Sequence, residues 1–282
     1  VSSAASDVYK RQFFMPILPT KQGKGKLIAS VERMPRGQLR FYRKSVYFRA
    51  NSTPVLKAIQ REVPAAISRI FLVPNPLPST LNLKKNWGNK EKTILYVGRI
   101  HPEKGIDILA EAFELVTNKW RHDFKLRIIG PSLISQGGAG KNYQLSLSRR
   151  FSRTNKIEWV GPIFNERLLA EEYQKASLFV YPSIAEKGET FGLAPLEAMS
   201  HACACITSDL DCFKDFLHHR VNGFIFNHRH NPVENLADLL KEILLEMPTE
   251  DLDSIRNNAV NVRISHSVEK VAYDFIEVLK SK

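Results

Sequence analysis

Between residues 92 and 226, short apolar runs alternate with longer stretches of mixed polarity. The apolar runs are TILYVGRI, FKLRIIG, IEWVG, SLFVYPS, CACITS and GFIF, and each is predicted to form a strand. After the first run, apolar residues recur at the spacing of one helix face: Ile106, Leu109, Ala110, Phe113 and Val116. The stretches NERLLAEEYQKA and APLEAMSHA predict two further helices.

Strands that are apolar on both faces and separated by single helices indicate a parallel sheet covered by helices on both sides. We therefore expect an α/β fold with a Rossmann-like parallel sheet. Ligands of such sheets bind beyond the carboxyl ends of the strands. Functional residues are therefore expected in the loops that follow TILYVG, FKLRIIG, IEWVG and LFVYPS.

The part of the chain before this sheet has a pattern that predicts a strand, a helix and a second strand. SVYFRA alternates like a strand, and TPVLKAIQREV predicts a helix capped by Thr53 with Pro54 at its first position. SRIFLVPNPLP predicts a short strand that prolines terminate. The polar stretch STLNLKKNWGNKEK has no period and is expected to link two domains.

These patterns divide the chain into five segments. We expect residues 1–12 to be a non-native or disordered leader, because they show no period, and 13–77 to belong to a first domain. Residues 78–91 are the expected linker, 92–265 the domain of the large sheet and 266–282 a C-terminal helix. Because the chain begins with valine, we expect it to be a fragment of a longer one.

The composition indicates a protein with a hydrophobic core and a strongly positive net charge. With 282 residues, 43% of them hydrophobic, the chain can bury a substantial core. Its formal net charge of +12 indicates an anionic partner, whether nucleic acid, anionic lipid headgroups or phosphorylated small molecules. No apolar run approaches the ~20 residues of a membrane span, and FFMPILP is too short for a signal-peptide core. A cytoplasmic protein is expected.

Three cysteines, Cys203, Cys205 and Cys212, lie close together in the sequence. Three cysteines in a chain of this size do not suggest a disulfide framework. A zinc site with His201 or His218 is an alternative, although C-A-C lacks the usual gap between ligands. We expect buried apolar cysteines and no metal.

The loop after the first strand of the large sheet, GRIHPEKG, carries Arg99 and Lys104 just before a helix. Two cations at a helix N-terminus, whose free N–H groups also favour negative charge, predict a phosphate site. The alternative is a structural arginine that forms a salt bridge with Glu103 or with a neighbouring loop.

The next two loops give weaker signals. PSLISQGGAGK is rich in glycine, but Ser135 and Asn142 stand where a phosphate-binding P-loop requires glycine and Ser or Thr, so a flexible loop is expected. In GPIF, main-chain groups around Ile163 could face a planar base, although a plain turn explains the sequence equally well.

The fourth loop, GETFGLAPLEAM, places two glutamates around the start of a helix. Phe191, Gly192 and Leu193 offer successive backbone N–H groups, and Pro195 fits the first helical position. Glu197 is then expected in the first turn, where the helix dipole favours its ionised form and lets it accept two hydrogen bonds from adjacent hydroxyls. Glu189 would meet hydroxyls from the other side. Two solvated charges at a loop–helix junction are the plainer alternative.

The runs VGRIHPEKGIDILAEAF, LRIIG, IEWVG, LFVYPS, GETFGLAPLEAM and NGFIF occur in an order that resembles the carboxyl-terminal half of the family 4 (group 1) glycosyltransferases. These are retaining enzymes of the two-domain GT-B fold. The resemblance covers roughly residues 92–280, and G-E-x-F-G-x-x-x-x-E-A-M is its most specific part. Residues 45–77 resemble the last strand, helix and strand of the amino-terminal domain, which holds the acceptor.

The resemblance implies a role for each candidate residue. Glu189 would be catalytic, contacting the hydroxyls of the donor sugar and stabilising positive charge at its anomeric carbon. Glu197 would hold the ribose and Ile163 would meet the base. The diphosphate would be bound by Arg99 and Lys104, and sugar or phosphate oxygens by the amides of residues 191–193. Protein cations would neutralise the leaving diphosphate, so no cofactor and no metal are implied.

The sequence departs from the family in two respects. Ala202 and Ala204 replace a glycine and a proline that usually follow the second glutamate, so the turn between helix and strand is expected to shift. Most of the amino-terminal domain is absent, so this chain is expected to bind donor without necessarily transferring sugar.

The implied partners are a nucleotide sugar and a glycan or lipid-linked acceptor, with no nucleic acid. An anionic membrane surface, met by Lys and Arg between residues 21 and 49, would use the positive charge. Two other functions stay open: a sugar-nucleotide-binding module without catalysis, and a glycoside hydrolase with two carboxylates.

Overall fold

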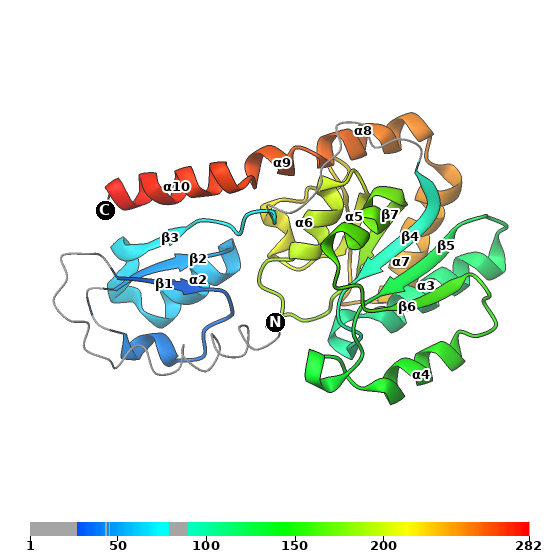
Figure 1. Ribbon diagram of the computed structural model, residues 1–282, viewed down its shortest axis with the longest axis horizontal. Helices are drawn as coiled ribbons and strands as arrows, with labels where there is room; N and C mark the ends of the chain where they lie inside the picture. Colours follow the sequence, from blue (N-terminus) through cyan, green and yellow to red (C-terminus); the bar gives the residue numbers. More distant parts are fainter. Residues whose placement is uncertain (1–26, 43, 45, 79–89, 282) are drawn as a thin grey trace. The chain divides into compact units, whose positions relative to one another are not determined.

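The computed structural model describes residues 27–42, 44, 46–78 and 90–281 of the chain (Figure 1). The expected leader at 1–12 and most of the expected linker at 78–91 therefore lie outside the described residues. The chain divides into two compact units. The larger comprises Asn75–Ala272, and the smaller combines the chain up to Pro74 with Tyr273–Lys282.

The larger unit contains a six-stranded, fully parallel sheet in the order β6-β5-β4-β7-β8-β9. Its strands are β4 (Glu91–Val97), β5 (Lys125–Ile129), β6 (Ile157–Gly161), β7 (Ala176–Tyr181), β8 (Ala204–Ser208) and β9 (Phe224–Phe226). Every predicted strand is present, and all six residues of the central strand β7 are buried. The predicted α/β fold with a parallel sheet is confirmed.

Strands β4 and β7 lie side by side in the sheet, although 78 residues, 98–175, separate them in the sequence. The strand order reverses between these two strands. From β4 the chain proceeds to β5 and β6 on one side, and from β7 to β8 and β9 on the other. Such a point leaves a crevice at the carboxyl ends of the two strands, because the following helices turn away to opposite faces. The loops after β4 and β7 are therefore the expected binding region of this sheet.

Helices cover the sheet (Figure 1). They are α3 (Ile106–Lys119), α4 (Lys141–Arg150), α5 (Glu166–Lys175), α6 (Leu193–Ser200), α7 (Pro232–Lys241) and α8 (Thr249–Ala259). The chain continues through α9 (Val262–Ser265), which packs against α6, into α10 (Val268–Ser281), whose part from Tyr273 onward belongs to the smaller unit. Helix α3 buries all five residues of its predicted apolar face and packs against α7. Helices α5 and α6 pack against strands that flank them.

The glycine-rich segment expected as a flexible loop has a defined backbone path. Gly138 N donates to Leu133 O at 2.9 Å, and Gly140 N donates to Ser132 O at 2.7 Å. The segment leads directly into α4, which was not predicted.

The smaller unit contains a three-stranded parallel sheet, β1 (Ile28–Val31), β2 (Tyr47–Ala50) and β3 (Ile70–Leu72), with α2 (Thr53–Glu62) packed on it. Thr53 is the first residue of α2 and Ser52 is its cap, so the expected cap is displaced by one position. The ring of Phe275, in the middle of α10, meets the ring of Phe71 in β3 with centroids 5.9 Å apart.

The three cysteines are free thiols buried in the larger unit. Cys205 lies in β8, and the Cys203 thiol donates to Tyr173 O at 3.0 Å. Ala202, which stands where the family usually has glycine, adopts a left-handed conformation with φ 57° and is fully buried. Alanine therefore occupies a left-handed backbone position that glycine would adopt without strain.

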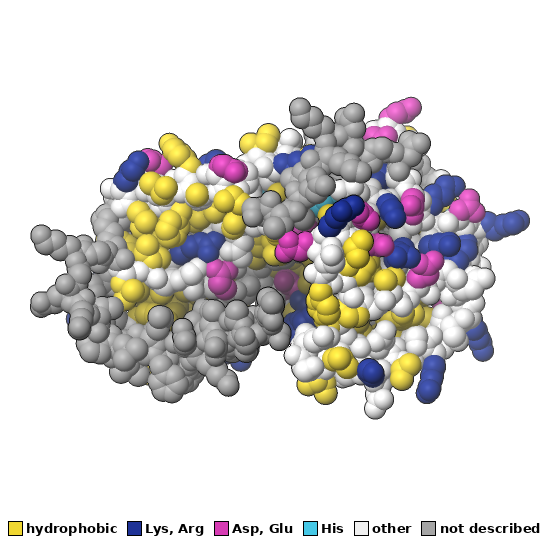
Figure 2. Space-filling model, in the orientation of Figure 1, with side chains coloured by type: hydrophobic (Ala, Val, Ile, Leu, Met, Phe, Trp, Pro, Cys, Tyr) yellow, Lys and Arg dark blue, Asp and Glu magenta, His cyan; other side chains and the backbone are white. Residues whose placement is uncertain are grey.

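No helix among the described residues is long and apolar enough to cross a bilayer. On the face drawn in Figure 2, lysine and arginine side chains of the larger unit are scattered among acidic ones.

Candidate functional site

The β4–α3 connection brings its cations against the loop that follows β7. A short 3-10 turn, Pro102–Lys104, leads into Gly105, which adopts a left-handed conformation at φ 64°. A Cβ at Gly105 would lie 2.2 Å from Pro182 O, so only glycine permits this approach. The first turn of α3 is thereby held next to the loop of residues 182–192.

Lys104 and Glu189, which are 85 positions apart in the sequence, form an ion pair with Nζ and Oε2 separated by 2.7 Å. The Lys104 side chain is 7% exposed and that of Glu189 is 11% exposed. The ammonium also lies 5.3 Å from the centre of the Tyr181 ring. A nearly buried pair of this kind requires both members, because removing one leaves an uncompensated charge.

Arg99 lies beside this pair but is bonded to the protein. Its guanidinium donates to Gly137 O at 2.7 Å and to a Glu103 carboxylate oxygen at 2.7 Å. The salt bridge with Glu103, which the sequence left open as an alternative to phosphate binding, is therefore present in this structure. The Arg99 side chain is 43% exposed, so it remains accessible to an anion that could replace or share its partners.

Two stacked tyrosines form the floor below these charges. The rings of Tyr96 and Tyr181 are nearly parallel, with centroids 5.9 Å apart. Burial and, after it, the negative charge of Glu189 hold the pKa of both phenols well above the ordinary value. Arg99 is close enough to oppose both shifts. Arg99, Lys104 and Glu189 thus converge on one place at the carboxyl ends of β4 and β7.

Glu197 lies in a different environment from the one expected. Helix α6 begins at Leu193, so Pro195 is its third residue and Glu197 its fifth, beyond the first turn. Burial raises the pKa of Glu197 to about 7, although a hydrogen bond from the Tyr173 hydroxyl at 3.0 Å acts in the opposite direction. The expected place of Glu197 in the first turn is therefore wrong, and desolvation, rather than the helix dipole, dominates the pKa of this carboxyl.

The loop with Ile163 reaches the same region. It connects β6 to α5, whose first turn is capped by the Asn165 side chain accepting from Leu168 N at 3.1 Å. Glu166, the first residue of α5, contributes to raising the pKa of Glu197. The beginning of α5 and the side chain of Glu197 are therefore electrostatic neighbours.

Residues 191–193, which lead into α6, differ in burial. Phe191 is buried and packs on Phe216, with ring centroids 5.8 Å apart, whereas Leu193 is 40% exposed. Gly192 has φ 95°, and a Cβ there would lie 2.5 Å from the Phe213 ring. Glycine at 192 is thus required both by the backbone and by the aromatic side chain packed on it.

The candidate residues therefore form two groups. Arg99, Lys104 and Glu189 converge, while Glu197 faces Tyr173 and the start of α5. The tyrosines at 96, 173 and 181 were missed by sequence reasoning, since their positions in apolar stretches resemble ordinary core residues. Only the tertiary contacts with carboxylates reveal them.

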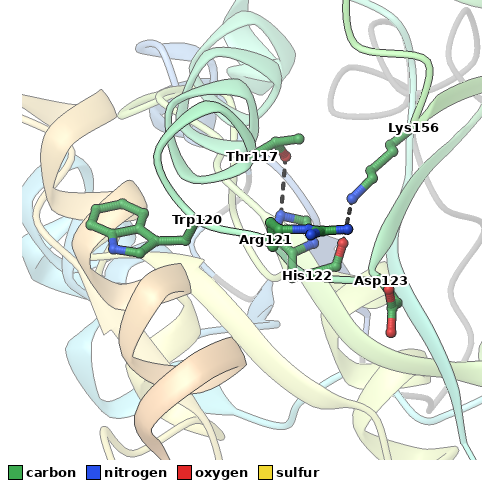
Figure 3. Close-up of a pocket in the computed structure, with 6 residues that line it drawn as sticks. All are labelled: Thr117, Trp120, Arg121, His122, Asp123 and Lys156. Atoms are coloured by element: carbon green, nitrogen blue, oxygen red, sulfur yellow. Dashed lines mark hydrogen bonds between the residues drawn. The ribbon is translucent and has the colours of Figure 1, made fainter.

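A pocket of about 420 Å³ lies at the opposite, amino-terminal edge of the sheet (Figure 3). It is lined by Thr117, Trp120, Arg121, His122, Asp123 and Lys156. Its central polar groups bond to one another: Thr117 Oγ1 and His122 Nε2 are 3.1 Å apart, and Lys156 Nζ donates to His122 O. The candidate site residues do not belong to this pocket.

The larger unit belongs to a known family. The model of the family described as "Glycosyl transferases group 1" matches residues 80–262, which is more than half of the chain. The chain is therefore a member of the group 1 glycosyltransferases, as the motifs suggested.

Two curated glycosyltransferases match the chain over most of its length. The chain is 29% identical over 203 residues to an uncharacterized glycosyltransferase of Methanocaldococcus jannaschii, covering 71% of this chain and 48% of that protein. It is 26% identical over 239 residues to a lipopolysaccharide 1,2-N-acetylglucosaminetransferase of Salmonella typhimurium, covering 80% and 60%. The chain thus spans about half of the first relative and three fifths of the second.

Solved structures share the fold at low sequence identity. A glycosyltransferase from Rickettsia africae has a TM-score of 0.72 at 18% identity, with 90% of this chain and 70% of that chain covered. The Anabaena protein HepE, solved in complex with UDP and glucose, has a TM-score of 0.70 at 17% identity, covering 91% and 72%. These likenesses confirm the predicted GT-B type of fold.

Proposed function

We propose that this chain supplies the donor-binding part of a retaining glycosyltransferase that takes a sugar from a nucleotide-sugar donor. The observation that carries the proposal is the nearly buried pair of Lys104 and Glu189 beside Arg99 at the switch point of the sheet. A site with cations for a diphosphate and a carboxylate for sugar hydroxyls matches the parts of such a donor. UDP and glucose in the related HepE structure support a donor of this class.

In this proposal, each candidate residue contacts one part of the donor. Lys104 and Arg99 hold the diphosphate, for which Arg99 gives up or shares its bond to Glu103. Glu197 accepts from the ribose hydroxyls, with Ile163 near the base. The amides of residues 191–193 bind sugar or phosphate oxygens at the start of α6.

Glu189 is the proposed catalytic residue. In transfer, the bond between the anomeric carbon and the diphosphate oxygen breaks, and an acceptor hydroxyl forms the new bond as its proton leaves for the departing phosphate. Positive charge grows at the anomeric carbon, where a nearby carboxylate stabilises it, and negative charge grows on the diphosphate beside Lys104 and Arg99. These protein cations make a metal unnecessary in the proposal.

The donor contact of Glu197 is tested by calorimetric titration with UDP-, GDP- and ADP-sugars. At pH 8, Glu197→Ala is expected to weaken the binding free energy of the preferred donor by ~2–3 kcal/mol, since hydrogen bonds to a charged acceptor are lost. Because the carboxyl, with its pKa of about 7, accepts both hydroxyl donors only when ionised, wild-type affinity should fall as the pH is lowered below 7.

The matched control is Glu171→Ala, a glutamate on α5 whose charge is paired with Arg167 at 3.4 Å. Equal donor affinity in wild type and Glu197→Ala at pH 8 would remove Glu197 from the site. A hydrolase would instead cleave glycosides without nucleotide, and a non-catalytic module would bind donor without turnover in the full-length protein.

The acceptor is proposed to be a sugar or a lipid-linked glycan. Its support is the breadth of the relatives, which include the Salmonella lipopolysaccharide enzyme and a phosphatidyl-myo-inositol mannosyltransferase of Mycobacterium tuberculosis, 31% identical over 129 residues (45% of this chain, 30% of that protein). The protein would work in the cytoplasm, at the surface of a membrane that carries such acceptors.

The basic stretch at 21–49 is proposed to contact anionic lipid. We expect the protein to co-sediment with phosphatidylserine-containing vesicles at low ionic strength and to be released by added salt, because counter-ions screen such contacts. Neutral vesicles are the control. Salt-sensitive binding to RNA or DNA instead of vesicles would favour a nucleic-acid partner for the same charge.

A further inference from the structure

The loop that carries Glu189 is fixed at several points before it reaches that residue. Ile184 N donates to Glu103 O at 2.9 Å, which ties the loop to the β4–α3 connection. Gly188 N and Glu189 N both donate to Ala185 O, at 3.0 and 2.9 Å, so residues 185–189 form one compact turn. Within such a turn, a displacement of residue 186 is passed on to residue 189.

Glu186, inside this turn, belongs to a cluster of four charged or titratable side chains from three loops. The other members are Asp209, which follows β8, and His228 and Arg229, which follow β9. Glu186 Oε1 lies 2.9 Å from an Arg229 guanidinium nitrogen and 3.0 Å from His228 Nε2. Arg229 and His228 Nδ1 also contact Asp209. We call these four residues the rim cluster.

His228 is the buried member of the rim cluster, whereas Glu186 and Arg229 are about half exposed. The His228 side chain is only 4% exposed, and its two ring nitrogens face two different carboxylates. Each ring nitrogen of His228 therefore lies within hydrogen-bonding reach of one carboxylate, that of Glu186 or that of Asp209. His228 N donates to Asp209 at 3.2 Å as well.

Asp209 connects the rim cluster to the large sheet. Partial burial alone would raise the pKa of Asp209, but the hydrogen bonds from His228 and the charge of Arg229 outweigh burial and lower it. Asp209 follows directly after the buried strand β8, so the cluster joins the Glu189 turn to a rigid element. A functional side chain placed on a loop needs such support to keep its geometry.

We propose that His228 and Arg229 are positioning residues. They hold the turn of residues 185–189 through Glu186 and thereby set the position of the Glu189 carboxylate. The inference rests on the proposed function. It differs from that function in assigning work to residues that contact neither the Lys104–Glu189 pair nor Glu197. Misplacement of a reacting group by about 1 Å costs on the order of 100-fold in rate, so a loosened turn would be visible in turnover.

The test compares Arg229→Met, Glu186→Gln and the double variant in the full-length protein. Each single variant is expected to lower kcat about tenfold while the affinity for free UDP, measured by calorimetry, changes less than about twofold, because the diphosphate contacts are elsewhere. The double variant should be no worse than the poorer single one, since both changes break the same contact. Arg229→Lys keeps the positive charge and should recover much of the rate.

Arg150→Met is the matched control, because Arg150 forms a similar half-exposed pair with Glu111 at 2.6 Å on helices away from the turn. It should leave kcat and UDP affinity unchanged. Hydrogen exchange supplies a readout independent of turnover: the amides of Gly188 and Glu189 should exchange faster in Arg229→Met than in Arg150→Met.

Two outcomes would overturn the proposal. One is unchanged exchange and a kcat within about twofold of wild type in Arg229→Met, which would make the cluster a surface ion pair. The other is an equal loss of UDP affinity and kcat, which would indicate a general structural role. Absence of transfer by the wild type would contradict the proposed function instead, and hydrogen exchange would then still show whether the rim cluster holds the turn.

Discussion

Replacing Glu189 with glutamine is expected to lower kcat for sugar transfer by about 10²–10³, the usual cost of removing one preorganised charge that stabilises a transition state. Glutamine keeps the size and a hydrogen-bonding oxygen but has no negative charge to oppose positive charge at the anomeric carbon. Affinity for free UDP should be retained or rise, since Lys104 loses its 2.7 Å partner and becomes available to the diphosphate. Steady-state kinetics and calorimetry on the same preparations measure both effects.

Glu111→Gln is the control for this variant, because it makes the same chemical change in α3 at an exposed pair with Arg150. It should leave kcat unchanged. If Glu189→Gln kept a kcat within a few-fold of wild type, Glu189 would not be the catalytic carboxylate, and the two-carboxylate argument would have to be rebuilt around Glu197.

Replacing Lys104 with methionine is expected to lower the free energy of unfolding by ~3–5 kcal/mol, because Glu189 would be left as a nearly buried, unpaired charge. The effect should depend on that charge rather than on the lost lysine stem, whose volume methionine largely replaces. The variant Lys104→Met/Glu189→Gln should therefore recover most of the stability. Denaturant unfolding of the four proteins completes a double-mutant cycle and isolates the pair.

An exposed pair in the same sheet supplies the control for stability. Lys92 in β4 lies 3.1 Å from Asp123, with the two side chains 62% and 83% exposed. Lys92→Met should change the free energy of unfolding by less than about 1 kcal/mol. A similar small change in Lys104→Met would show that water reaches Glu189 and that the pair does not organise the site.

Much of the larger unit could be predicted because its strands are local features. Each strand is a short apolar run that only a sheet covered on both faces accommodates, and the helix face at 106–116 is a regular pattern of five apolar residues. Helix α4 escaped prediction because KNYQLSLSRR buries only Leu147, so its sequence lacks the periodic apolar face on which such predictions depend.

The candidate site was predictable in part. The loops with Arg99, Lys104 and Glu189 follow strands that the sequence already identifies, and parallel strands bring their carboxyl ends to one edge. The expected place of Glu197 in the first turn was wrong, and its pKa could not be predicted, because burial and the contact with the Tyr173 hydroxyl 24 positions earlier cannot be estimated from the sequence. Tyr96, Tyr181 and the rim cluster had no local signal.

The parallel α/β fold, the family and the loops in which charged residues gather follow from the amino-acid order alone, because periodicity and motif spacing are properties of neighbouring residues. The pairing of Lys104 with Glu189, the bond of Arg99 to Glu103 and the burial that raises the pKa of Glu197 became visible only in the folded molecule. Ion pairing and desolvation depend on distances between residues far apart in the chain, and these distances exist only after the sheet has assembled.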